Sequence, residues 1–453
     1  MHARIAATLD GLHPAKDDDS PLAGDVAHHA ALGGRSELAV RASIAAGDRC
    51  LRLGARAEAA ELAERGLGYA ASLPRPTALP LQMELLKIYV HSHLGRRRSS
   101  ELENELARLV EEARAAGLAA PAQTGTYLLA TLADNRGATA EARELILRST
   151  ESSRGADAVT AARALGNTGR CLAQIERDQA RAESLLVEAA AIAREAGVAV
   201  IDIPWGFGLL RHFAGDYDEA SRELAEAERI ARAEEDHWSQ SQCLTHLAMI
   251  EIERGRPSAA MAHTEALRGV ADKLGEGSER PVADALAALA RRMLETEGAA
   301  EELARALEQL RAIDVNRFLA YTLNLAGRHD LERGELIEAA RCSNEALAAA
   351  AASGRGHSPT VIAECTLARA AALAGDDAGA AKHLAAAEAE AARPELLLSG
   401  FAADALAKAR SVLGVSTPVP TVPSTVAGET AARSNTDAGT DTPSDDRPTG
   451  GSA

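Results

Sequence analysis

The stretch Gly215-Asp216-Tyr217-Asp218-Glu219-Ala220 decides the fold, because it has the pattern of a tight turn between two helices. Glycine ends a helix at positive φ with little strain, and an Asp followed three residues later by Glu forms a cap that starts the next helix. Gly208 lies seven residues before the turn glycine and Ala227 twelve residues after it. Small side chains at these matched positions let two antiparallel helices pack closely.

The same pattern recurs along the chain at intervals of about 40 residues. Each copy has a turn glycine and, five residues later, an alanine: Gly54 and Ala59, Gly137 and Ala142, Gly255 and Ala260, Gly334 and Ala339, Gly375 and Ala380. Weaker copies begin at Gly95 and Arg177, and Gly327 repeats the small residue before Gly334. The interval from Gly255 to Gly334 is doubled, which places a missing turn near Gly298. The sequence therefore predicts about nine helix pairs, stacked into an all-α superhelix.

The composition agrees with a helical fold. Hydrophobic residues make up 46% of the 453 residues and aromatic residues only 2%. The apolar content is dominated by Ala and Leu, which favour helices over strands. The formal charge of −17 repels polyanions, and the one tight basic cluster, Arg96-Arg97-Arg98, has no aromatic neighbours. We therefore expect no direct contact with nucleic acid.

The cysteines and the apolar runs indicate a cytoplasmic protein. The five cysteines are scattered without a C-x-x-C pair, which does not suggest a disulfide framework. Residues 1–30 contain no continuous apolar core of the kind that a signal peptide requires. No run of about 18 apolar residues occurs, so a membrane span is not expected.

The turn and its small residues resemble the tetratricopeptide repeat, whose hallmark is small residues at matched positions of two helices. Gly208, Gly215, Tyr217, Ala220 and Ala227 match that repeat best, and Trp205 lies near the place where it often carries Trp. The period of about 40 residues exceeds the 34 of the standard repeat. The helices should therefore be longer, and the terminal Pro of the repeat has a convincing counterpart only in Pro394.

Longer units of this kind resemble the helical arm of large bacterial signalling ATPases, such as LuxR-type activators of the maltose-regulator kind and ATPase-linked nucleotide cyclases. The opening, from His2 to Leu9 and from Ala27 to Gly34, is similar to the segment that leads into their arm. The resemblance implies a binding arm and no more. A P-loop needs Lys after Gly, and none of the five lysines follows a glycine. The chain also has no C-terminal helix-turn-helix pattern.

The pattern divides the chain into three parts. Residues 1–37 are expected to form helices leading into the arm, and residues 38–413 the repeat superhelix. Residues 414–453 are rich in Ser, Thr, Pro, Gly and Asp and poor in large apolar side chains. Such a segment cannot bury enough surface to offset the entropy of ordering, so we expect a disordered tail.

No motif for catalysis or metal binding stands out. His91 and His93 are two residues apart and would point to different faces of a helix. Asp17-Asp18-Asp19 lies between prolines, with no second acidic motif to complete a site. Metalloprotease, nucleophile-elbow and dinucleotide motifs are absent from the sequence. We therefore expect no catalytic, cofactor-binding or metal-binding residues and no enzymatic activity.

The few aromatic side chains concentrate in two adjacent units. Trp205, Phe213, Tyr217 and Trp238 either fill the core where Ala is too small or line the concave face and contact a partner or effector. The leading hypothesis is a non-catalytic scaffold that binds a protein or peptide, as an arm of a signalling or transcription-regulating system. The alternatives are a domain that senses a small-molecule effector on its concave face, and a fragment of a larger ATPase-type regulator. The sequence leaves the oligomeric state open.

Overall fold

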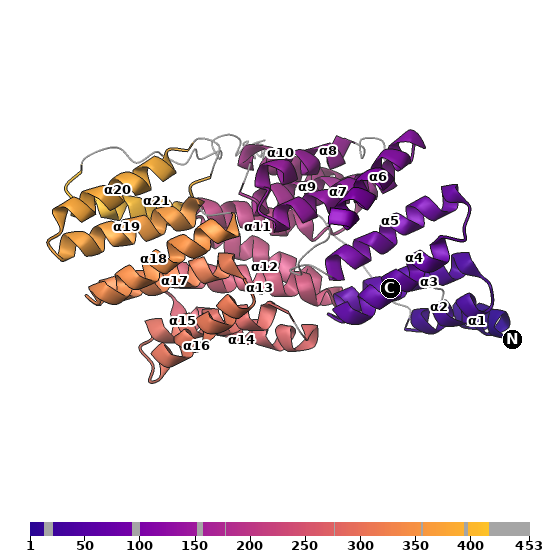
Figure 1. The fold of residues 1–453 in the computed structure, drawn as a ribbon, viewed down its shortest axis with the longest axis horizontal. Helices are drawn as coiled ribbons and strands as arrows, with labels where there is room; N and C mark the ends of the chain where they lie inside the picture. The colour runs from indigo at the N-terminus through magenta and orange to yellow at the C-terminus, as the bar shows by residue number, and fades with distance from the viewer. Residues whose placement is uncertain are drawn as a thin grey trace, which may run out of the picture. The chain divides into compact units, whose positions relative to one another are not determined.

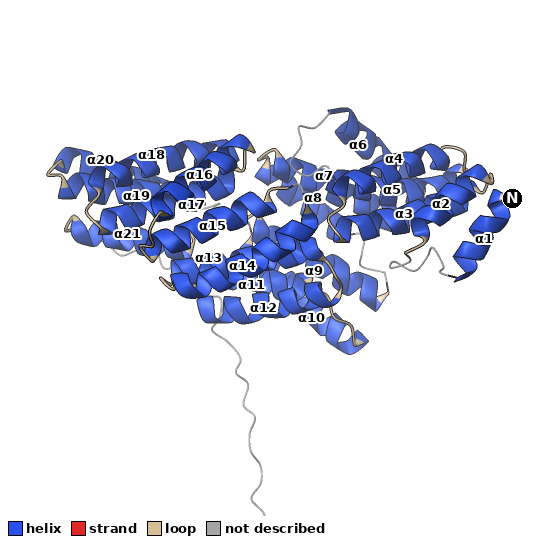
Figure 2. Ribbon diagram, turned by 90° about the horizontal axis from the view of Figure 1, so that it is seen from below, coloured by secondary structure: helices blue, strands red, loops and turns tan. Residues whose placement is uncertain are grey.

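The predicted all-α architecture is confirmed. The computed structural model describes residues 1–12, 21–92, 100–151, 157–176, 178–275, 277–354, 357–393 and 397–415. These residues form 21 helices and no strand (Figures 1 and 2). The helices are α1 (His2–Leu12), α2 (Ala23–Leu32), α3 (Ser36–Arg52), α4 (Arg56–Ala70), α5 (Arg75–Ser92), α6 (Ser100–Ala115), α7 (Ala119–Asn135), α8 (Thr139–Glu151), α9 (Ala158–Gln174), α10 (Gln179–Ala196), α11 (Asp202–Ala214), α12 (Tyr217–Ala233), α13 (His237–Glu253), α14 (Pro257–Leu274), α15 (Glu279–Met293), α16 (Ala299–Ala312), α17 (Asn316–Glu332), α18 (Leu336–Ser353), α19 (His357–Leu373), α20 (Asp377–Ala391) and α21 (Gly400–Val412).

The helices from α3 to α20 form nine consecutive pairs, the number that the repeat predicts. Six of the pairs turn at the glycines of the pattern, all with φ between +69° and +84°: Gly54, Gly137, Gly215, Gly255, Gly334 and Gly375. The turn expected near Gly298 joins α15 to α16, and Gly298 has φ of +75°. Gly95 lies outside the described residues.

The pair α11–α12 shows why the helices nest so closely. A Cβ atom placed on Gly208 would lie 2.6 Å from Cγ of Leu224, which is too close for any real side chain. Ala220 and Ala227 on α12 are fully buried. Asp216 caps the start of α12: its carboxylate accepts a hydrogen bond from the backbone N–H of Glu219 at 3.4 Å. Small side chains therefore bring the two helices together, and the cap and turn set where α12 starts.

The turn between α9 and α10 departs from the pattern. Arg177, the expected turn position, lies outside the described residues. Positive φ falls on the residues at either side of it, Glu176 and Asp178, at 57° and 52°. Gly169, seven residues before Glu176, is the residue that nests, since a Cβ there would lie 2.6 Å from Cγ of Leu186. The nesting glycine of α9 therefore lies one residue earlier than the pattern suggests, whereas Ala182, five residues after Arg177, is fully buried as predicted.

Neighbouring pairs bury hydrophobic side chains against one another. The largest cluster of buried side chains runs from Ala130 on α7 to Ala363 on α19. The repeat alanines are all fully buried, Ala260 within this cluster and Ala59, Ala142, Ala339 and Ala380 outside it. Gly327 lies within α17 against Cys342 of α18. Because each pair buries its apolar faces against the pairs on either side, the array stabilises itself through neighbour contacts.

Segments far apart in the sequence also touch. All described residues belong to one compact unit, Met1–Pro420. Within it, a Cβ on Gly54 would lie 2.4 Å from Cα of Leu274, and one on Gly400 would lie 2.6 Å from the carbonyl oxygen of Ala214. Helix α13 contacts α3. The turn of an early pair therefore packs against a helix end several pairs later.

Helices outside the nine pairs extend the array at both ends. Helices α1 and α2 precede α3, and α2 packs against it. At the other end α21 packs on α19, and Ala402, Leu406 and Ala409 share a buried cluster with Leu384 of α20. Residues 416–453, Asp17-Asp18-Asp19, Arg96-Arg97-Arg98 and Pro394 lie outside the described residues, so the expected tail and loops stay predictions.

Candidate functional site

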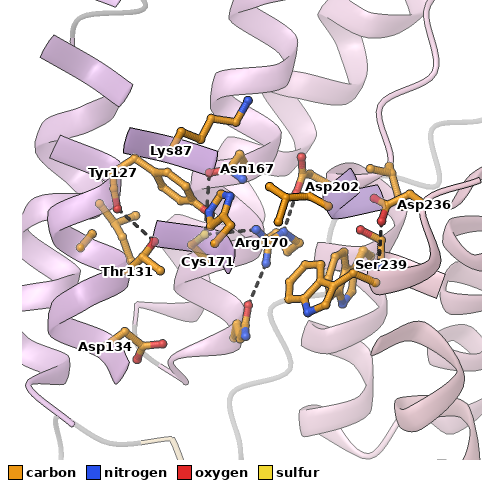
Figure 3. A pocket seen from close by; sticks show the side chains of 18 of the residues that line it. Lys87, Tyr127, Thr131, Asp134, Asn167, Arg170, Cys171, Asp202, Asp236 and Ser239 are labelled. Carbon is orange, nitrogen blue, oxygen red and sulfur yellow. Dashed lines mark hydrogen bonds and ion pairs between the residues drawn. The ribbon is translucent and has the colours of Figure 1, made fainter. Parts of the chain in front are cut away.

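The first helix of each of the first six pairs lines a cavity of about 500 Å³. Helices α3, α5, α7, α9, α11 and α13 each contribute side chains to its wall, and Arg56 at the start of α4 and Ile146 of α8 add to it. Figure 3 shows the cavity from close by. Its volume falls within the range of roughly 300–1,000 Å³ that is usual for ligand-binding pockets. We refer to it as the inner cavity.

Arg170 on α9 organises one wall of the inner cavity. It follows Gly169, which nests against α10, so its side chain is turned about 100° away from that helix. The guanidinium forms an ion pair with Asp202 and donates a hydrogen bond to Oε1 of Gln174 at 2.7 Å (Figure 3). Its carbon Cζ lies 4.5 Å from the ring centre of Trp205. Arg170 is only 5% exposed, and these three contacts hold its charged side chain in place.

The two tryptophans of the chain meet at this cavity. Trp205 on α11 and Trp238 on α13 both line it, with ring centres 5.7 Å apart. Asp236 caps α13 by accepting a hydrogen bond from the backbone N–H of Ser239 at 3.0 Å, which places Trp238 in the first turn of the helix. Trp205 is buried and Trp238 half-buried. The pair offers an aromatic surface beside the Arg170 guanidinium.

Polar side chains of α7 and α9 form a further part of the wall. Thr131 donates a hydrogen bond to the carbonyl oxygen of Tyr127 at 3.1 Å, and the Cys171 thiol lies 3.8 Å from Oδ1 of Asn167 (Figure 3). Burial raises the pKa of Tyr127 to about 12. Burial also raises the pKa of the Cys171 thiol. Both groups are therefore protonated at neutral pH, and Cys171 is not a thiolate nucleophile.

Charges on the cavity wall balance, in contrast to the whole chain. Four basic and four acidic side chains line it: Arg52, Arg56, Lys87 and Arg170, and Asp48, Asp134, Asp202 and Asp236. The chain as a whole carries a formal charge of −17. The cavity wall is therefore neutral overall but carries charges of both signs. It suits a ligand that has both positive and negative groups and an apolar or aromatic part.

The arrangement is suited to binding. Among the described residues, no group of three or more His, Cys, Asp or Glu side chains is placed to hold a metal ion. His91 lines the cavity and lies near Tyr127, with ring centres 6.3 Å apart, whereas His93 lies outside the described residues. Asp202 is paired with Arg170, which leaves that carboxylate poorly suited to act as a general base.

The other two aromatic residues singled out in the sequence lie elsewhere. Phe213 stacks on His212 with ring centres 5.6 Å apart, and Tyr217 lies beside the same imidazole at 6.2 Å. Nε2 of His212 is 3.1 Å from Oε2 of Glu253, and its Nδ1 is 3.2 Å from Nδ1 of His246. The structure thus brings Trp205 and Trp238 together at the inner cavity and places Phe213 and Tyr217 in a separate buried polar cluster.

Sequence reasoning missed most of the cavity wall. Tyr127, Arg170 and Asp202 carry no motif, and the ion-paired Arg170 and Asp202 belong to different helix pairs. One signal was present, because Gly169-Arg170 sets a large charged residue directly beside a nesting glycine in a buried helix. Charged residues are seldom fully buried without a partner, so this Arg could have been singled out.

No known protein-family profile matches the sequence, and no curated protein matches it. Solved structures do match. A Rap protein complexed with Competence and Sporulation Factor aligns with 78% of this chain and 98% of its own, at 11% identity and a TM-score of 0.53. A signal transduction ATPase with numerous domains and a tetratricopeptide repeat sensor, from Pyrococcus horikoshii, aligns with 73% of this chain and 52% of its own, at 16% identity and a TM-score of 0.46.

At 11% identity, the likeness to the Rap protein shows the fold alone. The chain is a tetratricopeptide-like array of helix pairs, as the turn pattern predicts. Every described helix is too short or too polar to cross a bilayer.

Proposed function

We propose that this chain is a non-catalytic scaffold that binds a segment of a protein or peptide partner in the inner cavity. The observation that carries the proposal is the cavity itself, about 500 Å³ in volume and lined by both tryptophans of the chain. Aromatic side chains beside charged and amide groups are typical of surfaces that bind peptides and proteins tightly. Binding of this kind fits the tetratricopeptide-like fold.

The structure of similar fold adds support. That Rap protein was crystallised with Competence and Sporulation Factor bound, so an array of this kind can hold a partner. The balanced charge of the cavity wall favours a short peptide, whose backbone offers both a donor and an acceptor at every residue except proline, over a polyanion. We further propose that the chain works in the cytoplasm, as an arm of a signalling or transcription-regulating system.

A small-molecule effector is the second candidate for the same cavity. Its volume lies within the range of pockets that enclose small ligands, and it combines aromatic walls with a few fixed polar groups. Occupancy by an effector would then control the binding of a partner elsewhere on the array. The two candidates differ in which ligand saturates the cavity, which an experiment can decide.

The fluorescence of the two tryptophans reports on the cavity without labelling, since both line it. Pools of synthetic peptides of three to eight residues and a metabolite collection are titrated against the full chain. A saturable change with a peptide supports the proposal, and one with metabolites alone favours the effector. No saturable response from either set would overturn ligand binding at this cavity.

A matched pair of variants locates the response. Asn135, an exposed residue at the end of α7, lines the cavity, so Asn135→Phe narrows it. Asn344, an exposed residue of α18, lies outside the cavity wall, so Asn344→Phe adds the same ring without narrowing it. Asn135→Phe should weaken binding at least tenfold, about 1.4 kcal/mol, and Asn344→Phe should leave it unchanged. Equal effects would place the ligand elsewhere.

A further inference from the structure

Arg56, in the wall of the inner cavity, takes part in a contact between distant segments. The turn from α3 to α4 meets the end of α14 and the start of α15, through Gly54, Arg56, Leu274 and Glu279. We call these four residues the seam. Figure 1 shows α3 and α4 in indigo and purple and α14 and α15 in pink and orange, which marks their distance in sequence.

Two contacts hold the seam. Cα of Gly54 packs so closely that a Cβ on it would lie 2.4 Å from Cα of Leu274. Nη2 of Arg56 lies 3.0 Å from Oε1 of Glu279, and the two side chains are only 20% and 6% exposed. The second carboxylate oxygen of Glu279 is buried and has no hydrogen-bond partner. Arg56 is therefore the group that compensates a nearly buried carboxylate, and this ion pair should be sensitive to replacement.

The seam adjoins α3, and α3 contacts α13. Asp48 and Leu51 of α3 line the cavity, as do Trp238 and Ser239 of α13. Arg56 belongs both to the seam and to the cavity wall. Separation of the seam would therefore move α3 away from α13 and widen the cavity between them.

The array can open in this way because the seam is not covalent. Between α4 and α14 the chain runs through the intervening helix pairs, each in contact mainly with its neighbours. In such arrays, small rotations at successive interfaces add up to a large displacement at the ends. The seam contact opposes that displacement directly.

We propose that the seam is a gate of the inner cavity, held closed by the Arg56–Glu279 ion pair. Closed, it keeps α3 against α13 and shields the tryptophan pair; open, it widens the cavity for a ligand to enter or leave. The proposal rests on the cavity and not on the identity of its ligand, so it can be tested with no ligand present.

A charge exchange tests the gate. Glu279→Arg places two cations at the seam and should open it, while Arg56→Glu combined with Glu279→Arg restores opposite charges. Acrylamide quenching of tryptophan fluorescence measures access to the cavity, because Trp205 and Trp238 are the two tryptophans of the chain and both line it. We expect the quenching constant to rise at least twofold in Glu279→Arg and to return towards the unchanged protein in the double variant.

A remote ion pair provides the control. Arg311 of α16 and Glu345 of α18 lie 2.6 Å apart, away from the cavity wall, so Glu345→Arg should leave quenching unchanged. Helical circular dichroism checks that each variant is folded, and the milder Glu279→Gln replaces Glu279→Arg if the latter does not fold. Unchanged quenching in a folded Glu279 variant would overturn the gate, as would an equal rise in the control or no restoration in a folded double variant.

Discussion

The close approach of paired helices predicts that two chemically identical substitutions will change the stability by different amounts. Gly208 and Gly269 both lie inside helices, in α11 and α14. Replacement of a helical glycine by alanine stabilises the helix by about 1 kcal/mol. A Cβ on Gly269 meets no atom within 4 Å, whereas one on Gly208 would lie 2.6 Å from Cγ of Leu224 and 3.3 Å from its backbone nitrogen.

The magnitude follows from these distances. Gly269→Ala gains only the higher helix propensity of alanine and should raise the free energy of unfolding by about 1 kcal/mol. Gly208→Ala gains the same helix propensity, but the added methyl group also forces α12 to shift. Overpacking of this kind costs about 1 to 3 kcal/mol. The two variants should therefore differ by about 1 to 3 kcal/mol, with Gly208→Ala the less stable.

Urea unfolding of the full chain, followed by helical circular dichroism, measures the difference. Repeat arrays do not always unfold in one step, so the midpoints of the same transition are compared before any free energy is derived. If Gly208→Ala stabilised the chain as much as Gly269→Ala, the close contact between α11 and α12 would be wrong, and with it the register of the pair.

Three further substitutions test the buried interior. Burial, with a contribution from His212, holds the pKa of His246 well below its usual 6.5. The stability that the neutral imidazole contributes is therefore present above about pH 6.5 and is lost as the pH falls, by up to about 1.4 kcal/mol per pH unit. The melting midpoint should drop more steeply between pH 7 and 5 in the unchanged protein than in His246→Gln, and equal slopes would assign the acid sensitivity to other groups. Asp202→Ala leaves the buried Arg170 without its carboxylate and should cost about 3 kcal/mol in urea unfolding, whereas a loss below 1 kcal/mol would mean that water or Gln174 replaces the ion pair. Ala220→Leu should lower stability by about 1 to 3 kcal/mol, because Ala220 is fully buried in its pair; an unchanged melting midpoint would count against the assigned packing.

The helix pairs were predictable because their determinants are local. A turn glycine and the small residues around it act within one unit of about 40 residues, so the repeat reveals where helices end and which ones nest. The α9–α10 turn shows the limit of this reasoning. Its positive φ falls on Glu176 and Asp178, which tolerate that conformation less readily than glycine, so no turn glycine marks this unit, and the nesting Gly169 lies one residue earlier than the pattern suggests.

The cavity was predictable only in part. The scarcity of aromatic residues drew attention to Trp205 and Trp238, which line it, but equally to Phe213 and Tyr217, which pack around His212. Composition cannot separate these two pairs, because all four residues lie on α11, α12 or α13. Which of them lines the cavity depends on how each helix is rotated about its axis.

The sequence by itself determined that the described helices from α3 to α20 stack as nine pairs, because the distance over which a small residue controls packing is shorter than one repeat. Only the tertiary structure decided that Gly54 packs against Leu274, that α3 contacts α13, and that a cavity lies among the inner helices. These features depend on the angle between each pair and the next, summed over many interfaces. Each angle is set by how the side-chain surfaces of two neighbouring pairs fit together. No single residue therefore predicts the sum of these angles.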